Sequence, residues 1–185
     1  MLTIENLSLS YGTDSKVLSD ITLKVKDGEC VLLTGESGSG KSSVINSING
    51  LAFEYENAQI SGSIKVGEKE IKNLELYEIS LMIASVFQNP KTHFFNVDTT
   101  LELLFYLENI GLDKKEMESR MNEMLDVFKI DHLLGRSIFE LSGGEKQILC
   151  VAAAYISGCK IIVLDEPSSN LDENYIDILK EMLII

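Results

Sequence analysis

Alternating hydrophobic and polar positions mark the beginning of the chain. Apolar residues recur at or near every second position within residues 2–9 and again within residues 21–25. This period of two is typical of strands that bury one face and leave the other to solvent, and such strands usually pair antiparallel. Residues 60–71 repeat the pattern on either side of Gly67, which predicts a hairpin.

Three later segments are more continuously apolar. Residues 30–34 and 161–164 are runs of the kind found in strands buried on both faces of a parallel sheet, and residues 81–87 form another expected strand. A helix is expected over residues 41–51, directly after a glycine-rich turn. Such strands, combined with helices, indicate an α/β fold with an antiparallel β portion at its start.

Residues 92–140 change to helical periodicity and are interpreted as a helical insert within a single domain of residues 1–185. Thr99 and Glu102 have the spacing of a capping box, in which two side chains reciprocally satisfy backbone N–H groups. Asp113 is expected to cap a second helix. The apolar side chains of that helix recur at helical spacing, which favours ordinary packing over a methionine-rich binding surface: Met117, Met121, Met124, Leu125 and Phe128.

Composition and charge limit the classes of function. The chain has 185 residues, 45% of them hydrophobic, and a formal net charge of −13. An acidic chain is poorly suited to bind nucleic-acid phosphates over a large surface. No apolar run reaches the roughly 18 residues of a membrane span, and the first residues lack the features of a signal peptide. Cys30, Cys150 and Cys159 have the spacing of neither a disulfide framework nor a zinc site, and are expected to be buried, reduced thiols.

A glycine-rich segment follows the first apolar run. Residues 35–42 read GESGSGKS and fit the pattern GxxxxGK[ST] of a phosphate-binding loop, in the strand-to-helix context that this motif requires. Its glycines let backbone N–H groups turn toward phosphate oxygens. Lys41 supplies a positive charge for the β- and γ-phosphates, and Ser42 offers a hydroxyl to Mg²⁺. The expected nucleotide contacts are Gly35, Glu36, Ser37, Gly38, Ser39, Gly40, Lys41, Ser42 and Ser43.

Two acidic residues follow the apolar run at residues 161–164. A carboxylate at the end of a strand beside a phosphate loop can hold Mg²⁺, usually through water, and this is the role expected of Asp165. Glu166 follows directly and is placed to polarise a water molecule that attacks the γ-phosphate. Without the phosphate loop, both acids would be interpreted as ordinary solvated residues at the end of a strand.

A second glycine-containing segment lies about a hundred residues after the phosphate loop. Residues 141–147 read LSGGEKQ, in which Ser142 and Glu145 have the spacing of a capping box at the start of a helix. Gly143 and Gly144 leave the N–H groups of the first helical turn open to an anion. The chain thus contains two candidate anion sites.

Taken in order, the segments GESGSGKS, LSGGEKQ, IIVLDE and SNLD make the chain resemble the ATP-binding cassette of ABC transporters over nearly its whole length. The resemblance implies a P-loop NTPase fold with a mixed sheet, and binding and hydrolysis of ATP with Mg²⁺. It also implies that cassettes pair head to tail, so that the signature motif of one closes over the γ-phosphate bound by the other. The signature of this chain consists of Leu141, Ser142, Gly143, Gly144 and Glu145.

Further residues match the pattern of this family. Tyr11 corresponds to the aromatic residue that stacks on adenine, and Asp172 to the loop that crosses the interface of paired cassettes. Gln88 corresponds to the glutamine that contacts Mg²⁺ and water, so the resemblance implies Gln88 and Glu166 as catalytic residues. The metal ligands that it implies are Ser42, Gln88 and Asp165.

Residues 87–95 resemble importers of the energy-coupling-factor and cobalt type more than exporters. This implies import of a small solute through integral membrane partner subunits, and a location at the cytoplasmic face of the membrane. Soluble ABC proteins that act on ribosomes or DNA ends are an alternative, but they carry a second cassette or a long coiled coil, whereas about fifty residues separate Gln88 from Leu141 here. A degenerate cassette that binds ATP without hydrolysis is a further alternative. The transported substrate is chosen by partner proteins.

The chain departs from the family pattern in two places. Ile148 stands where family signatures usually carry arginine, so we expect a looser signature helix. The family's switch histidine follows the SNLD segment, whereas His93 and His132 lie in the helical insert, so neither fits that role. Together with the apolar residues 182–185, this indicates a cassette truncated at its C-terminus, and we expect residues 1–185 to bind Mg²⁺-ATP with little or no hydrolysis.

Replacement of Lys41 tests the phosphate loop. Lys41→Ala removes the positive charge expected to meet the β- and γ-phosphates, so ATP should bind much more weakly while the fold is retained. Calorimetric titration with ATP measures the affinity, and circular dichroism measures the fold. An unchanged affinity in a folded Lys41→Ala protein would show that this loop does not hold the nucleotide.

Overall fold

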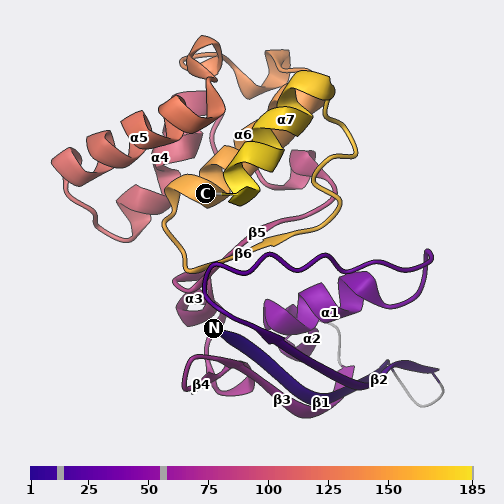
Figure 1. The fold of residues 1–185 in the computed structure, drawn as a ribbon. Helices are drawn as coiled ribbons and strands as arrows, with labels where there is room; N and C mark the ends of the chain where they lie inside the picture. Colours follow the sequence, from indigo (N-terminus) through magenta and orange to yellow (C-terminus); the bar gives the residue numbers. More distant parts are fainter. Residues whose placement is uncertain (12–14, 55–57, 185) are drawn as a thin grey trace. The chain divides into compact units, whose positions relative to one another are not determined.

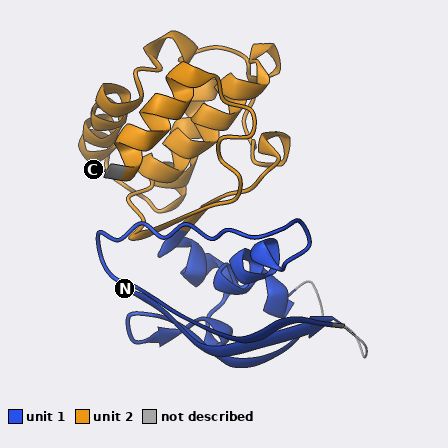
Figure 2. Cartoon of the chain, turned by 45° about the vertical axis from the view of Figure 1, so that its right-hand side comes forward, with its two compact units in different colours: residues 1–83 blue, residues 84–185 orange. Residues whose placement is uncertain are grey.

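The computed structural model describes residues 1–11, 15–54 and 58–184 (Figure 1). It divides into two compact units, residues 1–83 and 84–185, which Figure 2 shows in different colours. The predicted fold class is confirmed, because an antiparallel sheet near the N-terminus is followed by helices and a further pair of strands. The interpretation of residues 1–185 as a single domain with an insert stays a prediction.

The first unit is built on an antiparallel sheet with the strand order β2-β1-β3-β4. The hairpin between β3 and β4 turns at Gly67, which has a positive φ of 60°, as the sequence predicted. The elements of this unit are β1 (Leu2–Tyr11), β2 (Ser15–Val25), α1 (Lys41–Ile48), α2 (Leu51–Glu54), β3 (Ala58–Val66), β4 (Lys69–Glu70), the 3-10 helix η1 (Ile71–Asn73) and α3 (Leu76–Ser80).

The buried positions of the central strand β1 change from even to odd along its length. Leu2 and Ile4 are buried before the change, and Leu7 and Leu9 are buried after it. The pairing of β1 with β2 and β3 shifts register over the same stretch, where Asn6 has a left-handed φ of 52°. A β-bulge therefore keeps all four apolar side chains on the buried face although their spacing is not strictly two.

Gly62 of β3 lies opposite this bulge. Its φ is +92°, and a Cβ atom at this position would lie 2.5 Å from the carbonyl oxygens of both Glu5 and Asn6. Backbone atoms cannot move aside as the end of a flexible side chain can, so only glycine fits here. The bulge in β1 and the glycine in β3 are complementary, and together they fix the register of the two strands.

The predicted helix over residues 41–51 is present but divided. α1 ends at Ile48, and Gly50, with a φ of +77°, lies between it and α2. A Cβ atom on Gly50 would lie 2.5 Å from Ile79 Cδ1, so another residue would displace this side chain, and the positive φ of the turn itself favours glycine. The buried apolar side chains of the unit are Leu2, Ile4, Leu7, Leu9, Leu18, Val44, Ile48, Ala52, Ile64, Val66, Ile71, Ile79 and Ile83.

The predicted buried strand over residues 30–34 is wrong. These residues carry no strand in the structure and are exposed, Leu32 to 84%. An apolar run becomes a buried strand only where neighbouring strands satisfy its backbone groups, and none of the strands among the described residues pairs with it. The expectation of buried thiols fails here too, because Cys30 is exposed, whereas Cys150 is buried and Cys159 is half-buried; none of these three cysteines forms a disulfide.

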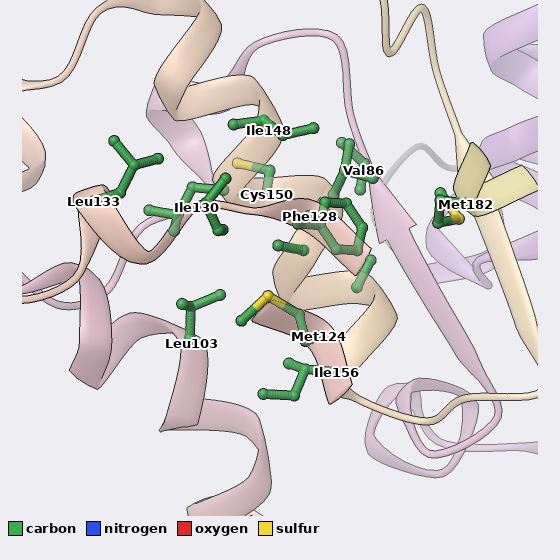
Figure 3. Close-up of a cluster of buried hydrophobic side chains, with 14 of the residues drawn as sticks. Val86, Leu103, Met124, Phe128, Ile130, Leu133, Ile148, Cys150, Ile156 and Met182 are labelled. Atoms are coloured by element: carbon green, nitrogen blue, oxygen red, sulfur yellow. The ribbon is translucent and has the colours of Figure 1, made fainter. Parts of the chain in front are cut away.

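The second unit combines a two-stranded sheet with a group of helices. β5 (Ile83–Val86) pairs with β6 (Ile161–Leu164). Figure 3 shows part of the core, in which side chains of α4, α5 and α6 gather. No helix among the described residues is long and apolar enough to cross a membrane. The helices are η2 (Pro90–Thr92), α4 (Thr99–Asn109), α5 (Lys114–Phe128), η3 (Asp131–Leu133), η4 (Ile138–Glu140), α6 (Gly143–Ile156) and α7 (Glu173–Ile184).

The helix starts in the helical segment agree only in part with the sequence. Asp113 caps α5 as predicted. The predicted capping box of Thr99 and Glu102 is wrong, because Asp98, one residue earlier, is the N-cap of α4. Thr99 is instead fully buried and donates its hydroxyl hydrogen to Leu133 O at 2.6 Å. Glu102 accepts hydrogen bonds from backbone N–H groups of the loop that precedes α4.

The apolar side chains of α5 pack as in an ordinary helix, as predicted. Met124 and Phe128 are buried, and Met117, Met121 and Leu125 pack against the same cluster. β6 is half-buried along its whole length, so its predicted burial on both faces is wrong. Among the described strands, β6 pairs with β5 alone, which leaves it less covered than a central strand would be. The last residue of the apolar run 182–185 lies outside the described residues.

Gly62→Ala should destabilise the first unit more than Gly67→Ala. Both residues have a positive φ, but only Gly62 lies against backbone atoms, whereas nothing lies within 4 Å of a Cβ atom built at Gly67. We expect the free energy of unfolding to fall by about 3 kcal/mol for Gly62→Ala and by about 1 kcal/mol for Gly67→Ala. Urea denaturation followed by circular dichroism measures both values, and equal losses would contradict this account of the bulge.

Candidate functional site

Residues 35–39 form an exposed loop that leads into α1. Gly38 and Gly40 have positive φ angles of 81° and 94°, and Gly40 is the N-cap residue of α1. A Cβ atom on Gly40 would lie 2.7 Å from Leu18 Cδ2 and 3.2 Å from Val17 O, so space beside β2 is tight, and the positive φ itself favours glycine. The glycine turn therefore leads directly into the start of α1. The first N–H groups of this helix have no acceptor within the helix, so they can bind an anion.

Lys41 opens α1, and its side chain returns to the loop. Its Nζ atom donates hydrogen bonds to the carbonyl oxygens of Gly35 and Glu36, both at 2.8 Å. These neutral acceptors hold the ammonium group at the loop, and negatively charged phosphate oxygens would bind it more strongly. The geometry fits the role expected of Lys41, while the nucleotide contacts of the loop residues stay predictions.

Three other residues predicted to contact nucleotide also belong to the first unit. Tyr11 is the last residue of β1 and is half-buried. Ser42 and Ser43 lie in the first turn of α1, where Ser42 is exposed and Ser43 is half-buried. The stacking of Tyr11 on adenine and the contact of Ser42 with a metal ion stay predictions.

In the second unit, the ends of β5 and β6 bring Gln88 and Glu166 together. The Asp165 N–H donates to Val86 O at 2.8 Å, which aligns the two strand ends. Just beyond them, Gln88 Nε2 donates to Glu166 Oε2 at 2.8 Å. Glu166 has a left-handed φ of 48°, a conformation that is uncommon for a residue with a side chain and is concentrated at functional sites. The sequence predicted both residues, but neither their hydrogen bond nor this backbone conformation.

The predicted metal ligands Ser42, Gln88 and Asp165 offer a hydroxyl, an amide and a carboxylate group. Hard oxygen donors of this kind suit Mg²⁺, which usually takes few protein ligands and completes its shell with water and substrate phosphates. Because Gln88 donates through Nε2, its amide oxygen is the atom that remains for a metal ion. In the described parts of the chain, no group of three or more His, Cys, Asp or Glu residues could hold a metal ion. The types of donor thus suit Mg²⁺, and joint ligation of one metal ion by these residues stays a prediction.

His93 anchors the loop that contains Gln88. The Phe87 N–H donates to His93 Nε2 at 2.9 Å, so this nitrogen is an acceptor and carries no proton. Burial lowers the pKa of His93 from its ordinary value of 6.5, and the opposing effect of the Glu102 carboxylate is smaller, which agrees with a neutral ring. The position of His93 in the sequence gave no sign of this local role.

Ser142 begins α6 with the capping box that the sequence predicted. Its Oγ atom accepts a hydrogen bond from Glu145 N at 3.2 Å, and Glu145 Oε2 accepts one from Ser142 N at 2.7 Å. A Cβ atom on Gly144 would lie 2.9 Å from Asn170 O, whereas one on Gly143 would have no contact closer than 3.9 Å. A neighbouring loop of the same chain therefore requires glycine at position 144, which the motif alone does not reveal.

Asp172 follows that loop and holds the start of α7. Its Oδ1 atom accepts a hydrogen bond from Tyr175 N at 3.0 Å, and its carbonyl oxygen accepts one from Ile176 N at 2.9 Å. Tyr175 Oη lies 3.4 Å from His132 Nε2, within hydrogen-bonding distance. Burial raises the pKa of Tyr175, and the carboxylates of Glu145 and Asp172 add to this, so its hydroxyl stays protonated. The role predicted for Asp172 at an interface between cassettes stays a prediction.

The expected loosening of α6 at Ile148 stays a prediction. Ile148 is fully buried in the core cluster of the second unit, as Figure 3 shows. Leu141, the first residue of the signature segment, is buried in the same cluster. α6 continues to Ile156, because apolar packing holds the position that a charged side chain was expected to anchor.

A polar pocket of about 620 Å³ lies among the loop after β5, the start of α6 and the loop before α7. Its lining contains two lysines and no carboxylate group: Gln88, Asn89, Pro90, Lys91, Gly143, Lys146, Ser169 and Asn170. A predicted catalytic residue and a predicted signature residue thus share one cavity within the second unit.

Known proteins are similar to this chain over most of its length. A family model described as "ABC transporter" matches residues 18–169. A "Putative ABC transporter ATP-binding protein" of Treponema denticola is 42% identical over 184 residues, which cover 99% of this chain and 38% of that protein. A "Putative HMP/thiamine import ATP-binding protein YkoD" of Bacillus subtilis is 37% identical, over 98% of this chain and 34% of that protein. The chain thus spans 38% and 34% of the length of these two relatives.

Two solved structures share the fold. The structure of cbiO1 from Clostridium perfringens, described as part of the ABC transporter complex cbiONQ, has a TM-score of 0.83 and 27% sequence identity, and the match covers 98% of this chain and 72% of that one. The ATP-binding cassette MJ0796, solved as a dimer in a post-hydrolysis state with ADP and Pi, has a TM-score of 0.79 and 23% identity over 99% of this chain and 83% of that one. The resemblance that the motifs indicated is confirmed, and the chain belongs to the ABC transporter family of ATP-binding proteins.

Proposed function

We propose that the protein to which this chain belongs is the ATP-binding subunit of an ABC transporter and that, as it occurs in the cell, it binds and hydrolyses ATP in a head-to-tail pair of cassettes. The observation that carries this proposal is the 2.8 Å hydrogen bond between Gln88 Nε2 and Glu166 Oε2. It keeps a carboxylate suited to general-base catalysis next to an amide suited to a metal ion and water.

Different residues of the chain are proposed to bind the phosphates, to bind the metal ion and to accept the proton of the attacking water. Lys41, together with the N–H groups of the phosphate loop, offsets the charge of the β- and γ-phosphates. Ser42, Gln88 and Asp165 are the residues that would hold Mg²⁺, which would supply positive charge to offset that of the phosphates. Glu166, oriented by its hydrogen bond with Gln88, accepts a proton from the attacking water.

The start of α6 serves the nucleotide of the second cassette. Ser142 and Glu145 fix the first helical turn, and the glycines between them leave its N–H groups open. One chain then provides two anion sites, the phosphate loop in its first unit and the signature in its second. The second cassette is either another copy of this chain or a related chain.

We infer import as the direction of transport, with integral membrane subunits as partners and the cytoplasmic face of the membrane as the location. Residues 87–95 support this through their resemblance to importers. YkoD is described as an import ATP-binding protein, and cbiO1 as part of a transporter complex. The net charge of −13 disfavours the alternative of a soluble ABC protein bound to nucleic acid.

ATP-driven pairing tests this function. In the protein as it occurs in the cell, Glu166→Gln should trap an ATP-bound dimer, because an amide cannot take the proton of the attacking water. Adding Gly144→Asp should undo the trap, since the new carboxylate would face the γ-phosphate and its Cβ atom would lie 2.9 Å from Asn170 O. Size-exclusion chromatography with light scattering measures the dimer fraction at saturating ATP.

Ser119→Asp is the matched control for the added charge, because Ser119 lies exposed on α5. Combined with Glu166→Gln, it should leave the dimer fraction unchanged. The signature assignment would be refuted if Gly144→Asp also left the dimer fraction unchanged. Dimers that form equally without ATP would refute nucleotide-driven pairing.

A further inference from the structure

The first turn of α6 contains a negative charge close to the place where an anion is expected to bind. Glu145 is the third residue of the helix and directly follows Gly143 and Gly144. Two negative charges a few ångströms apart repel each other, so a bare carboxylate here would oppose a phosphate group that approaches the glycine N–H groups. An anion site at this helix start therefore requires a balancing cation.

Both oxygens of the Glu145 carboxylate accept hydrogen bonds. Oε2 accepts one from Ser142 N at 2.7 Å, and Oε1 accepts one from Arg136 Nη1 at 2.9 Å. The side chains of Arg136 and Glu145 are 35% and 20% exposed, so water screens this ion pair only in part. The Ser142 N–H foremost, with a smaller contribution from Arg136, lowers the pKa of Glu145, so the carboxylate remains ionised.

Arg136 is held in place independently of Glu145. Its backbone N–H donates to Thr99 Oγ1 at 3.2 Å, and its carbonyl oxygen accepts from Thr99 N at 3.0 Å. Thr99 is fully buried, and its hydroxyl donates to Leu133 O at 2.6 Å. Arg136 Nη2 also donates to Glu140 O at 3.4 Å. The guanidinium group therefore reaches Glu145 from a backbone that Thr99 holds in place, and its contact with Glu140 O helps to orient it.

We propose that Arg136 is a positioning residue of the signature, which balances the charge of Glu145 so that the glycine N–H groups remain attractive to the terminal phosphate of a nucleotide on a second cassette. The capping box can then contain a carboxylate without repelling the phosphate group that binds at the helix start. This inference rests on the proposed function, because it takes the start of α6 as the site for the partner's nucleotide. Arg136 lies outside the LSGGEKQ segment, so the motif itself gives no sign of it.

Removing one charge and then the other separates charge balance from structure. Arg136→Gln leaves the charge of Glu145 unbalanced, whereas Glu145→Gln removes that charge and keeps an oxygen for the capping box. In the Glu166→Gln protein as it occurs in the cell, Arg136→Gln should raise the ATP concentration for half-maximal pairing about tenfold. Adding Glu145→Gln should return that concentration to within about threefold of the starting value.

Two further variants complete the set. Lys114→Gln is the matched control, because it removes a positive charge from an exposed ion pair with Glu118 on α5, and it should change the ATP concentration for pairing less than about twofold. Arg136→Lys keeps the charge without the guanidinium geometry and should give an intermediate value. The affinity of the phosphate loop for ATP, measured with protein too dilute to pair, should be the same in every variant.

An unchanged ATP concentration for pairing in Arg136→Gln would overturn the inference. A loss that Glu145→Gln fails to restore would also overturn it, because Arg136 would then act only through the backbone that it joins to Thr99. If circular dichroism shows that Arg136→Gln does not fold, Arg136→Lys decides instead, and a value equal to that of the starting protein would count against the guanidinium. A Glu166→Gln protein that binds ATP but never pairs would refute the proposed function and, with it, this inference.

Discussion

The start of α6 is the feature on which the candidate site of the second unit depends. It is fixed by its capping box, while the N–H groups of its glycines remain accessible to a ligand. The reciprocal hydrogen bonds between Ser142 and Glu145 satisfy the backbone N–H groups of these two residues and leave those of the two glycines between them to a ligand. Buried apolar side chains such as Ile148 anchor the helix from behind, and Asn170 O approaches Gly144 from the side. An anion site made of backbone N–H groups needs this rigidity, because donors that had to be ordered on binding would lose affinity to entropy.

The phosphate loop in the first unit meets the same requirement by different means. It is an exposed segment, and its shape depends on the positive φ angles of Gly38 and Gly40. Its charge is carried by Lys41, whose ammonium group donates hydrogen bonds to two carbonyl oxygens of the loop. The two candidate anion sites therefore differ in kind, since one combines a glycine turn with a lysine side chain and the other combines a capped helix with an ion pair.

The features that the sequence predicted well are those whose conformation depends on residues adjacent in the chain. The hairpin and the capping box at Ser142 depend on a few adjacent side chains, although one of the capping assignments failed because Asp98 competed from a single residue away. The exposure of residues 30–34 could not be predicted, because burial of an apolar run depends on pairing with other strands, which its own residues do not determine. The motifs identified Gln88 and Glu166 individually, but their contact joins residues far apart in the chain, and only the paired strands β5 and β6 produce it.

The hydrogen bond that Phe87 N–H donates to His93 Nε2 makes the second unit sensitive to acid. A proton on this nitrogen would set two donors against each other, and the loop between the two residues would lose its anchor. Because burial lowers the pKa of His93 below 6.5, the unfolded chain takes up this proton first, and stability is lost as the pH falls from about 6.5 toward the folded-state pKa. Acidification would thus disturb the contact between Gln88 and Glu166 indirectly, because protonated His93 would no longer hold the loop that contains Gln88.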